Sequence, residues 1–271
     1  MINTHTHIYT EDFDNDRALA IERARSVGVE TFVMPCVNMD SVARMRRLRE
    51  EDPAHFCCAY GVHPEEITEE WRQELQEMKE IVFSEKEMCA VGEIGIDLHW
   101  NTTNKKEQET AFEEQLSWAK ELGLGVIVHC RDAMDVTLGC IRNVGVEKGI
   151  MHCFSGGVED ARTVLGMGVW KLGIGGVVTF KNSGLGEVVK YVGVDYVVLE
   201  TDDPWLAPVP YRGKRNEPSY MAIVVDKIAD ITQSTAHEVV KKTTKNAKEV
   251  LKILSLQSSV RIDRKERCSS G

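Results

Sequence analysis

The chain has 271 residues, a formal net charge of −10, 42% hydrophobic residues and 28% charged residues. This composition is typical of a globular protein that forms two ordinary domains or one large α/β domain. The negative charge argues against a protein that coats nucleic acid or an anionic membrane through bulk electrostatics. It does not argue against an enzyme that binds one end of a nucleic acid.

The cysteines and the apolar runs give an expectation for cellular location. Eight cysteines are scattered along the chain without a C-x-x-C pair, which is typical of a reduced protein. The first strand is expected to begin at residue 1, which leaves no room for a signal peptide, and no apolar run approaches the ~20 residues of a membrane helix. A cytoplasmic protein that makes no contact with membranes is predicted.

Short apolar runs alternate with amphipathic segments along the chain. Strands are predicted at 1–8, 31–37, 56–61, 88–91, 126–130, 149–153, 170–174 and 196–201. Helices are predicted at 16–27, 40–50, 69–84, 106–122, 135–144, 159–166, 185–191, 220–231 and 236–254. Eight strands, each followed by a helix, predict a single-domain α/β fold over residues 1–256, a (β/α)8 TIM barrel, with an open doubly wound sheet as the alternative. The polar, basic tail at 257–271 is expected to be poorly ordered.

The segment MINTHTHI at residues 1–8 is the first candidate for a functional site. Because alternate side chains of a strand point to the same face, His5 and His7 are expected to project together. Two imidazoles on one face suit a transition metal, although two solvated histidines at a chain terminus are the alternative. The metal hypothesis therefore depends on whether later strands bring ligands to the same place.

The carboxyl ends of the strands form the active-site rim of such a barrel, and several later strands end in suitable residues. These residues are His63, Glu93, His129, His152 and Asp202. Each has a structural alternative, such as a buried histidine bonded to a carbonyl, a buried ion pair or a helix cap. Their joint occurrence at one rim, together with the first two histidines, instead indicates a hydrolytic site for two divalent metal ions.

Seven motifs carry a family resemblance: INTHTHI, GVHPEE, AVGEIGID, VIVHCRDA, GIMHCFSG, LGIGGVVTFKN and VVLETDDPWLAP…RGKRNEP. In this order they resemble the TatD family of metal-dependent hydrolases, within the amidohydrolase superfamily of TIM barrels. The resemblance implies metal-dependent DNase activity, commonly exonucleolytic, with zinc, magnesium or manganese as the ions. It implies one ion at His5, His7 and Asp202, a second at His129 and His152, and Glu93 as the bridge. Asn3 and Asp203 stand where the family usually has Asp and Ala, but every implied ligand is present.

Candidate substrate contacts surround this predicted metal site. The resemblance implies that His63 faces the substrate, and Arg131 is expected to orient ligands or substrate. The glycine-rich segment 173–176 is followed by Lys181 and Asn182, which could join the substrate rim. The densest basic cluster before the tail is either a solvated loop or a contact for an anionic substrate: Arg212, Lys214 and Arg215.

The predicted reaction is hydrolysis of a phosphodiester bond in single-stranded or end-frayed DNA by a monomeric enzyme. Two cations lower the pKa of bound water and neutralise the phosphoryl oxygens, while Asp202 accepts the proton of the attacking water and Glu93 sets the metal–metal distance. The same site could instead hydrolyse an ester or amide, for example an aminoacyl ester on tRNA. A catalytically silent barrel that binds nucleic acid or a protein is a third reading, although a silent barrel is expected to have lost a ligand.

Overall fold

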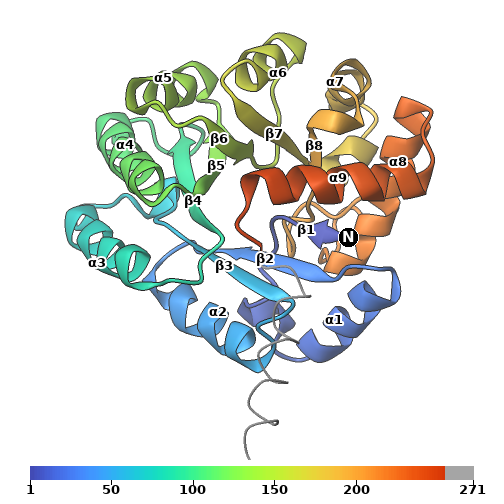
Figure 1. The fold of residues 1–271 in the computed structure, drawn as a ribbon, viewed down its shortest axis with the longest axis horizontal. Coiled ribbons are helices and arrows are strands. Elements are labelled where there is room, and N and C mark those ends of the chain that lie inside the picture. The colour runs from blue at the N-terminus through green and yellow to red at the C-terminus, as the bar shows by residue number, and fades with distance from the viewer. Residues whose placement is uncertain (254–271) are drawn as a thin grey trace, which may run out of the picture.

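The computed structural model describes residues 1–253, in which eight parallel strands form a barrel surrounded by helices (Figure 1). The strands neighbour one another in sequence order. The seam between the last strand and the first is closed by the Thr4 amide, which donates to the Leu199 carbonyl at 2.9 Å. The predicted (β/α)8 barrel is therefore confirmed and the doubly wound sheet is excluded. The tail predicted at 257–271 lies outside the described residues.

Helices and strands alternate as the hydrophobic pattern predicts. The strands are β1 (Ile2–Asn3), β2 (Thr31–Pro35), β3 (Phe56–Tyr60), β4 (Ala90–Asp97), β5 (Gly125–Arg131), β6 (Lys148–Met151), β7 (Val169–Ile174) and β8 (Val197–Leu199). The α-helices are α1 (Arg17–Ser26), α2 (Met39–Glu51), α3 (Trp71–Ser84), α4 (Lys105–Leu122), α5 (Met134–Val144), α6 (Val158–Leu165), α7 (Leu185–Val192), α8 (Met221–Thr232) and α9 (Ala236–Val250). Short 3-10 helices include η2 (Pro64–Glu66) and η3 (Gly176–Thr179).

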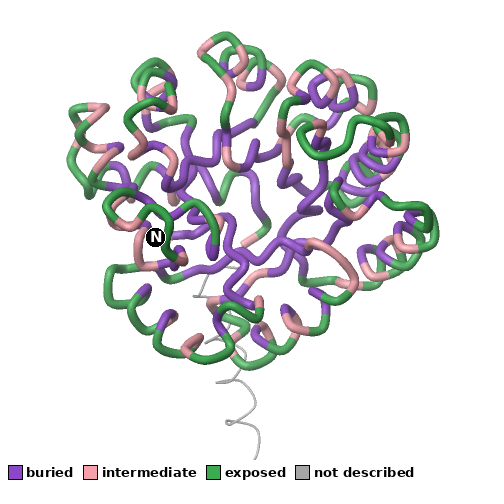
Figure 2. The backbone as a smooth tube through the Cα atoms, turned by 180° about the vertical axis from the view of Figure 1, so that it is seen from behind, coloured by how far each residue is buried: buried purple, intermediate pink, exposed green. Residues whose placement is uncertain are grey.

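The outer helices bury one face against the barrel and expose the other, as Figure 2 shows. In α4, Ala111, Phe112, Leu116 and Ala119 recur at helical spacing and are buried. The helix ends at Gly123, whose φ of +64° lies in the left-handed region that glycine adopts at little cost. Local spacing and a local stop signal therefore predict this helix from its own segment.

Apolar side chains fill the inside of the barrel and leave only one mouth for chemistry. The inner cluster contains Ile2, Val33, Ala59, Ala90, Ile127, Ile150 and Val198. Helix α9 packs Ala247, Val250 and Leu251 onto this cluster and crosses the barrel opening in Figure 1. Burying each branched apolar side chain of this cluster contributes roughly 1.5–3 kcal/mol. Because α9 covers the amino-terminal mouth, the carboxyl ends of the strands face the mouth that stays open.

Strand β1 is shorter than predicted. It ends at Asn3, so strand alternation is the wrong explanation for the common direction of His5 and His7. Hydrogen bonds to distant segments hold the chain there instead: the Thr6 amide donates to the Val33 carbonyl at 3.1 Å, and the His7 amide to the Asp203 carbonyl at 3.0 Å. The sequence pattern could not show this, because both acceptors come from other strands.

Strand β4 extends beyond the predicted end at Val91 and contains Glu93. The pairing register of β4 with β5 shifts between Val91 and Ile94, so Glu93 lies at a β-bulge. Bulges redirect side chains, and the Glu93 amide is held by the Cys36 carbonyl at 3.0 Å. The carboxylate consequently points into the barrel mouth.

No helix within residues 1–253 is both long enough and apolar enough to cross a membrane.

Candidate metal centre

All six predicted metal ligands meet at the carboxyl ends of the strands. Five of them line a cavity of about 670 Å³: His7, Glu93, His129, His152 and Asp202. The sixth, His5, is fully buried against them. Residues separated by almost 200 positions in the chain are thus brought within contact distance by the barrel.

Glu93 lies at the centre of this group and divides the imidazoles into two pairs. Its Oε2 atom is 3.2 Å from His5 Nε2 and 3.9 Å from His7 Nε2. Its Oε1 atom is 3.1 Å from His129 Nδ1 and 3.6 Å from His152 Nε2. Because its two oxygens face different predicted ligands, this carboxylate has the arrangement that a ligand shared by two ions requires.

Asp202 adds a second carboxylate from the loop after β8. Its Oδ1 atom is 3.6 Å from the Nε2 atoms of both His5 and His7 and 3.8 Å from His152 Nε2. The backbone φ of Asp202 is +55°, a left-handed conformation that aspartate tolerates better than most residues. Its amide donates to the His5 carbonyl at 3.0 Å, which fixes the loop against the first histidine motif.

The charges of the two carboxylates and of His5 suit a cation. Burial alone raises the pKa of Glu93, but the neighbouring imidazoles, His5 foremost, hold it well below its ordinary value. Burial likewise opposes ionisation of Asp202, but the neighbouring imidazoles, His152 foremost, together lower its pKa. Burial, with a smaller contribution from His152, lowers the pKa of His5 to about 4. At neutral pH the carboxylates are charged and His5 is neutral, the states in which these groups bind metals.

Two imidazoles are oriented by groups that the sequence analysis did not identify. His7 Nδ1 lies 2.8 Å from the Tyr9 hydroxyl, which donates its own proton to the Pro35 carbonyl. His7 therefore donates from Nδ1 and leaves Nε2 free toward the cavity. His129 Nε2 lies 2.9 Å from Asp97 Oδ2. Metal-binding imidazoles commonly donate their second N–H to a carboxylate or another acceptor.

The third orienting group is Glu200, which is completely buried. Its Oε1 atom accepts from the Cys153 amide at 2.6 Å and lies 3.3 Å from His152 Nδ1. Space for this carboxylate exists because residue 173 is glycine: a Cβ atom there would lie 2.2 Å from Glu200 Oε2. An acidic residue at the end of the apolar run VVLE was the available sequence signal.

We expect Glu200→Gln to weaken metal binding by about 10- to 100-fold while the protein remains folded. The amide keeps the shape of the side chain but loses the negative charge that lies 3.3 Å from His152 Nδ1. Gly173→Ala is expected to act similarly, because the new Cβ displaces the carboxylate. Calorimetric titration of apoprotein with Zn²⁺ measures the change, and Gly139→Ala in α5, where a Cβ meets nothing within 4 Å among the described residues, is the control. Wild-type affinity in Glu200→Gln would contradict this role.

A buried polar chain links the loops after β1 and β8 and contains Asn3 and Asp203, two of the departures from the family pattern. Asn3 Nδ2 donates to Thr201 Oγ1 at 2.7 Å, and the Thr201 hydroxyl donates to Asp203. The other oxygen of Asp203 accepts from the Thr6 hydroxyl at 3.0 Å. Because buried polar groups cost free energy unless they are bonded, this chain fixes the loops that carry His5, His7 and Asp202.

His63 faces the metal ligands, and its hydrogen bonds differ from those of His7. It precedes η2, and its Nδ1 atom accepts a hydrogen bond from the Glu65 amide at 3.2 Å. A neutral His63 therefore carries its proton on Nε2, which lies 3.5 Å from Glu93 Oε1. This geometry makes His63 a hydrogen-bond donor toward the cavity.

The other predicted substrate residues occupy different positions relative to the cavity. Arg131 ends β5 and lines the cavity, with its guanidinium carbon 5.2 Å from the centre of the Trp100 ring. Lys181 and Asn182 are exposed after η3, and neither belongs to the described residues that line the cavity. Arg212 is stacked on Phe180 at 4.5 Å.

Arg215 does not fit its predicted role as a substrate contact. Its two terminal nitrogens donate to the Asp16 carboxylate at 2.7 and 2.8 Å, and one also bonds the Asp12 carbonyl. The guanidinium further packs over Phe13. Sequence proximity to Asp202 suggested a phosphate contact, but the fold brings a carboxylate from residue 16 to this arginine.

We expect Arg215→Gln to destabilise the protein at neutral pH by up to about 1 kcal/mol, since the pair is partly exposed. Hydrogen bonds from Arg215 lower the pKa of Asp16 to about 2. A carboxylate with a depressed pKa contributes stability fully above its unfolded pKa of ~3.9, and the contribution disappears as the pH falls toward 2. Urea unfolding at pH 7 and pH 2 tests this, with Lys214→Gln as the control. A difference that persists unchanged at pH 2 would contradict the assignment to Asp16.

Four imidazoles and two carboxylates at the open mouth of a barrel are typical of metal-dependent hydrolases. The chain belongs to the TatD-related DNase family, whose model matches residues 2–252. It is 38% identical over 256 residues to YabD of Bacillus subtilis, described as an uncharacterized metal-dependent hydrolase, with 93% of this chain and 99% of that protein covered. It is 29% identical over 262 residues to the 3'-5' ssDNA/RNA exonuclease TatD of Pantoea vagans, with 93% and 100% covered. The crystal structure of YJJV, a TatD homolog from Escherichia coli, has a TM-score of 0.88 at 26% identity, covering 94% of this chain and 98% of that one.

Proposed function

We propose that this protein is an exonuclease that hydrolyses phosphodiester bonds at an end of single-stranded DNA, using two divalent metal ions. The observation that carries the proposal is the position of Glu93, whose two oxygens face separate imidazole pairs. The relative from Pantoea vagans, named as a 3'-5' ssDNA/RNA exonuclease, supports a single-stranded nucleic acid as the substrate. Ester or amide hydrolysis at the same site, for example of aminoacyl-tRNA, is not favoured by these relatives.

The residues present fit a pair of cations. His5 Nε2 and His7 Nε2 are 2.9 Å apart, and each lies 3.6 Å from Asp202 Oδ1, so two nitrogens and a carboxylate converge where a cation could bind. Imidazole-rich ligand sets suit zinc, whereas magnesium and manganese favour oxygen ligands. We infer the following assignment: one ion at His5, His7 and Asp202, a second at His129 and His152, and Glu93 shared between them.

The ions, when bound, lower the pKa of water and neutralise charge on the phosphoryl oxygens. The protein supplies the proton acceptor and the donors. Asp202 is ionised at neutral pH and faces the ligand cluster, so it accepts the proton of the attacking water. His63 donates from Nε2 to a phosphoryl oxygen, and Arg131 binds a neighbouring phosphate at the cavity rim.

Further features of this proposal concern the surroundings of the site and the state of the protein. Arg212, Lys214, Lys181 and Asn182 are proposed as outer contacts for the rest of the strand. We propose a monomer in the cytoplasm, where the seven cysteines within residues 1–253, all free thiols, are expected to stay reduced.

The test is parallel incubation of metal-reconstituted protein with labelled single-stranded DNA, duplex DNA, RNA and aminoacyl-tRNA. We expect single-stranded DNA to shorten one nucleotide at a time from one end, and labels at the 5' and 3' ends identify that end. Glu93→Gln, prepared identically, controls for contaminating nucleases. Deacylation of tRNA without cleavage of any polynucleotide would replace this proposal with the esterase alternative.

A further inference from the structure

Two of the five tryptophans stand at the mouth of the metal cavity and are largely exposed. Trp100 is 69% exposed and Trp205 is 52% exposed, whereas the other three indoles, Trp71, Trp118 and Trp170, are at most 3% exposed. Both exposed indoles line the cavity that holds the metal ligands. Exposed large aromatic rings at a pocket are typical of a binding surface rather than of a folded core.

The barrel topology places these two indoles on opposite sides of the cavity. Trp100 lies in the loop after β4, and Trp205 lies in the loop after β8. Because the strands neighbour one another in sequence order, β4 and β8 are four strands apart, on opposite sides of the barrel (Figure 1). A ligand seated at the metals therefore has one indole on each side.

Neighbouring side chains hold both rings in place. The Trp205 ring meets the His7 ring edge to face at 5.1 Å, which ties it directly to a proposed metal ligand. The Trp100 ring lies against the His99 ring at 4.8 Å and under the Arg131 guanidinium at 5.2 Å. An aromatic face and a cation thus share one rim, which matches the alternation of base and phosphate in a nucleic acid strand.

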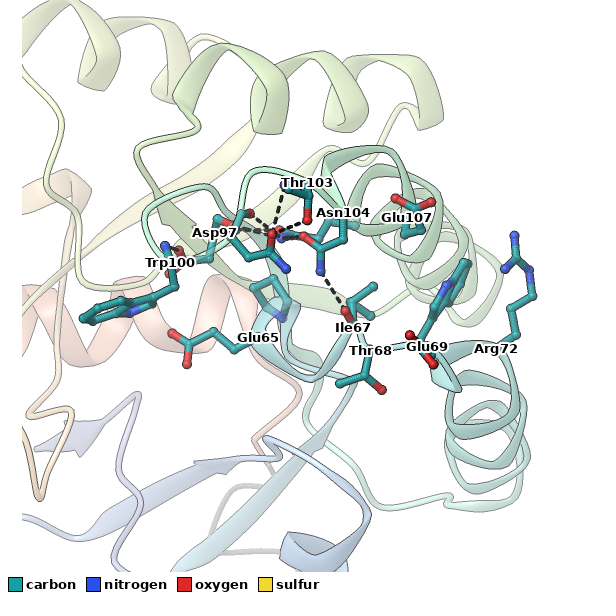
Figure 3. A pocket seen from close by; sticks show the side chains of 14 residues that line it. Glu65, Ile67, Thr68, Glu69, Arg72, Asp97, Trp100, Thr103, Asn104 and Glu107 are labelled. Carbon is teal, nitrogen blue, oxygen red and sulfur yellow. Dashed lines mark hydrogen bonds between the residues drawn. The ribbon is translucent and has the colours of Figure 1, made fainter.

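The carboxylates beyond Trp100 argue that a base rather than a phosphate lies on that outer side of the indole. Beyond Trp100 lies a second hollow of about 780 Å³, and Figure 3 shows the indole at its edge, directed away from Asn104. The carboxylates of Glu65, Glu69 and Glu107 line this hollow and outnumber the one cation among its described lining residues, Arg72. They repel phosphates, and so does the net charge of −10. Affinity on this side must then come from the metals, from Arg131 at the cavity rim and from uncharged contacts such as the indole.

We propose that Trp100 and Trp205 stack on the nucleobases that flank the scissile phosphate, one on each side. This inference rests on the proposed function. Stacking requires unpaired bases, so the two indoles select single strands over duplexes. It is also tolerant of sequence, because every base has an aromatic face.

The test measures binding of metal-loaded protein to a phosphorothioate-linked oligothymidylate, which resists hydrolysis, and to the same backbone with abasic sites. We expect Trp100→Ala and Trp205→Ala each to bind the oligothymidylate about 5- to 150-fold more weakly and the abasic backbone unchanged. Trp100→Phe and Trp205→Phe should recover most of the affinity. Quenching of tryptophan fluorescence on binding reports the stacking itself. Tyr191→Ala, which removes an equally exposed aromatic ring (52%) on α7, is the control, and metal content and unfolding midpoints verify that each variant is intact.

The outcomes separate this inference from the proposed function. Suppose that wild-type protein cleaves single-stranded DNA, but that Trp100→Ala and Trp205→Ala bind the oligothymidylate and the abasic backbone with wild-type affinity. The stacking proposal is then overturned, and the exonuclease assignment stands. If wild-type protein binds the abasic backbone as tightly as the oligothymidylate, stacking is also overturned. If wild-type protein cleaves no polynucleotide, the proposed function fails first and takes the stacking proposal with it.

Discussion

Glu93→Ala is expected to remove both metal ions and to lower the rate of hydrolysis roughly a thousandfold, because the ions supply several kcal/mol of transition-state stabilisation. The expectation follows from the contacts of its two oxygens with both imidazole pairs. His152→Ala is expected to release mainly one ion, since its Nε2 faces only one oxygen of Glu93. Elemental analysis of the purified variants gives metal content independently of activity.

Glu93→Gln and circular dichroism serve as the controls for this experiment. The glutamine variant keeps the volume of the side chain and distinguishes the loss of charge from the loss of packing. Unchanged circular dichroism would show that the barrel is intact without its central carboxylate. Wild-type occupancy of both ions in Glu93→Ala would refute the bridging role, and the loss of a single ion would assign Glu93 to one ion only.

Gly95→Ala is expected to lower the free energy of unfolding by about 4 kcal/mol, from backbone strain and overpacking together. Gly95 has a φ of +153°, and a Cβ atom there would lie 1.9 Å from the His129 carbonyl oxygen. Because Gly95 pairs with His129 between β4 and β5, relief of the clash must move one of these strands. The same movement displaces Glu93 or His129, so metal affinity should fall together with stability. Urea unfolding followed by circular dichroism measures the first effect, and calorimetric titration with Zn²⁺ measures the second.

Gly139→Ala is the matched control for this substitution. Gly139 lies within α5, where an added Cβ meets nothing within 4 Å among the described residues. Alanine is favoured over glycine in a helix by up to ~1 kcal/mol, so this variant should be as stable as the wild type or more so. Equal unfolding free energies for the two variants would show that the barrel tolerates a side chain at residue 95.

The order of helices and strands, and the placement of six candidate metal ligands at one mouth of the barrel, could be predicted from the sequence alone. Helix α4 illustrates the first: apolar residues at helical spacing and a glycine stop are encoded within one segment. The ligands were recognisable because parallel strands deliver their carboxyl ends to one mouth, so residues such as His129 and His152 could be placed there from their local position.

The side chains that meet across the barrel could be identified only from the folded structure. It assigned Glu200 to His152, Asp97 to His129 and Asp16 to Arg215, and it showed that hydrogen bonds from β2 and the β8 loop direct His5 and His7. Each of these contacts joins residues from different elements, and most join residues far apart in the chain. Hydrophobic periodicity and turn residues report on neighbours along the chain, whereas hydrogen-bond partners and exposed faces depend on how the elements close into a barrel.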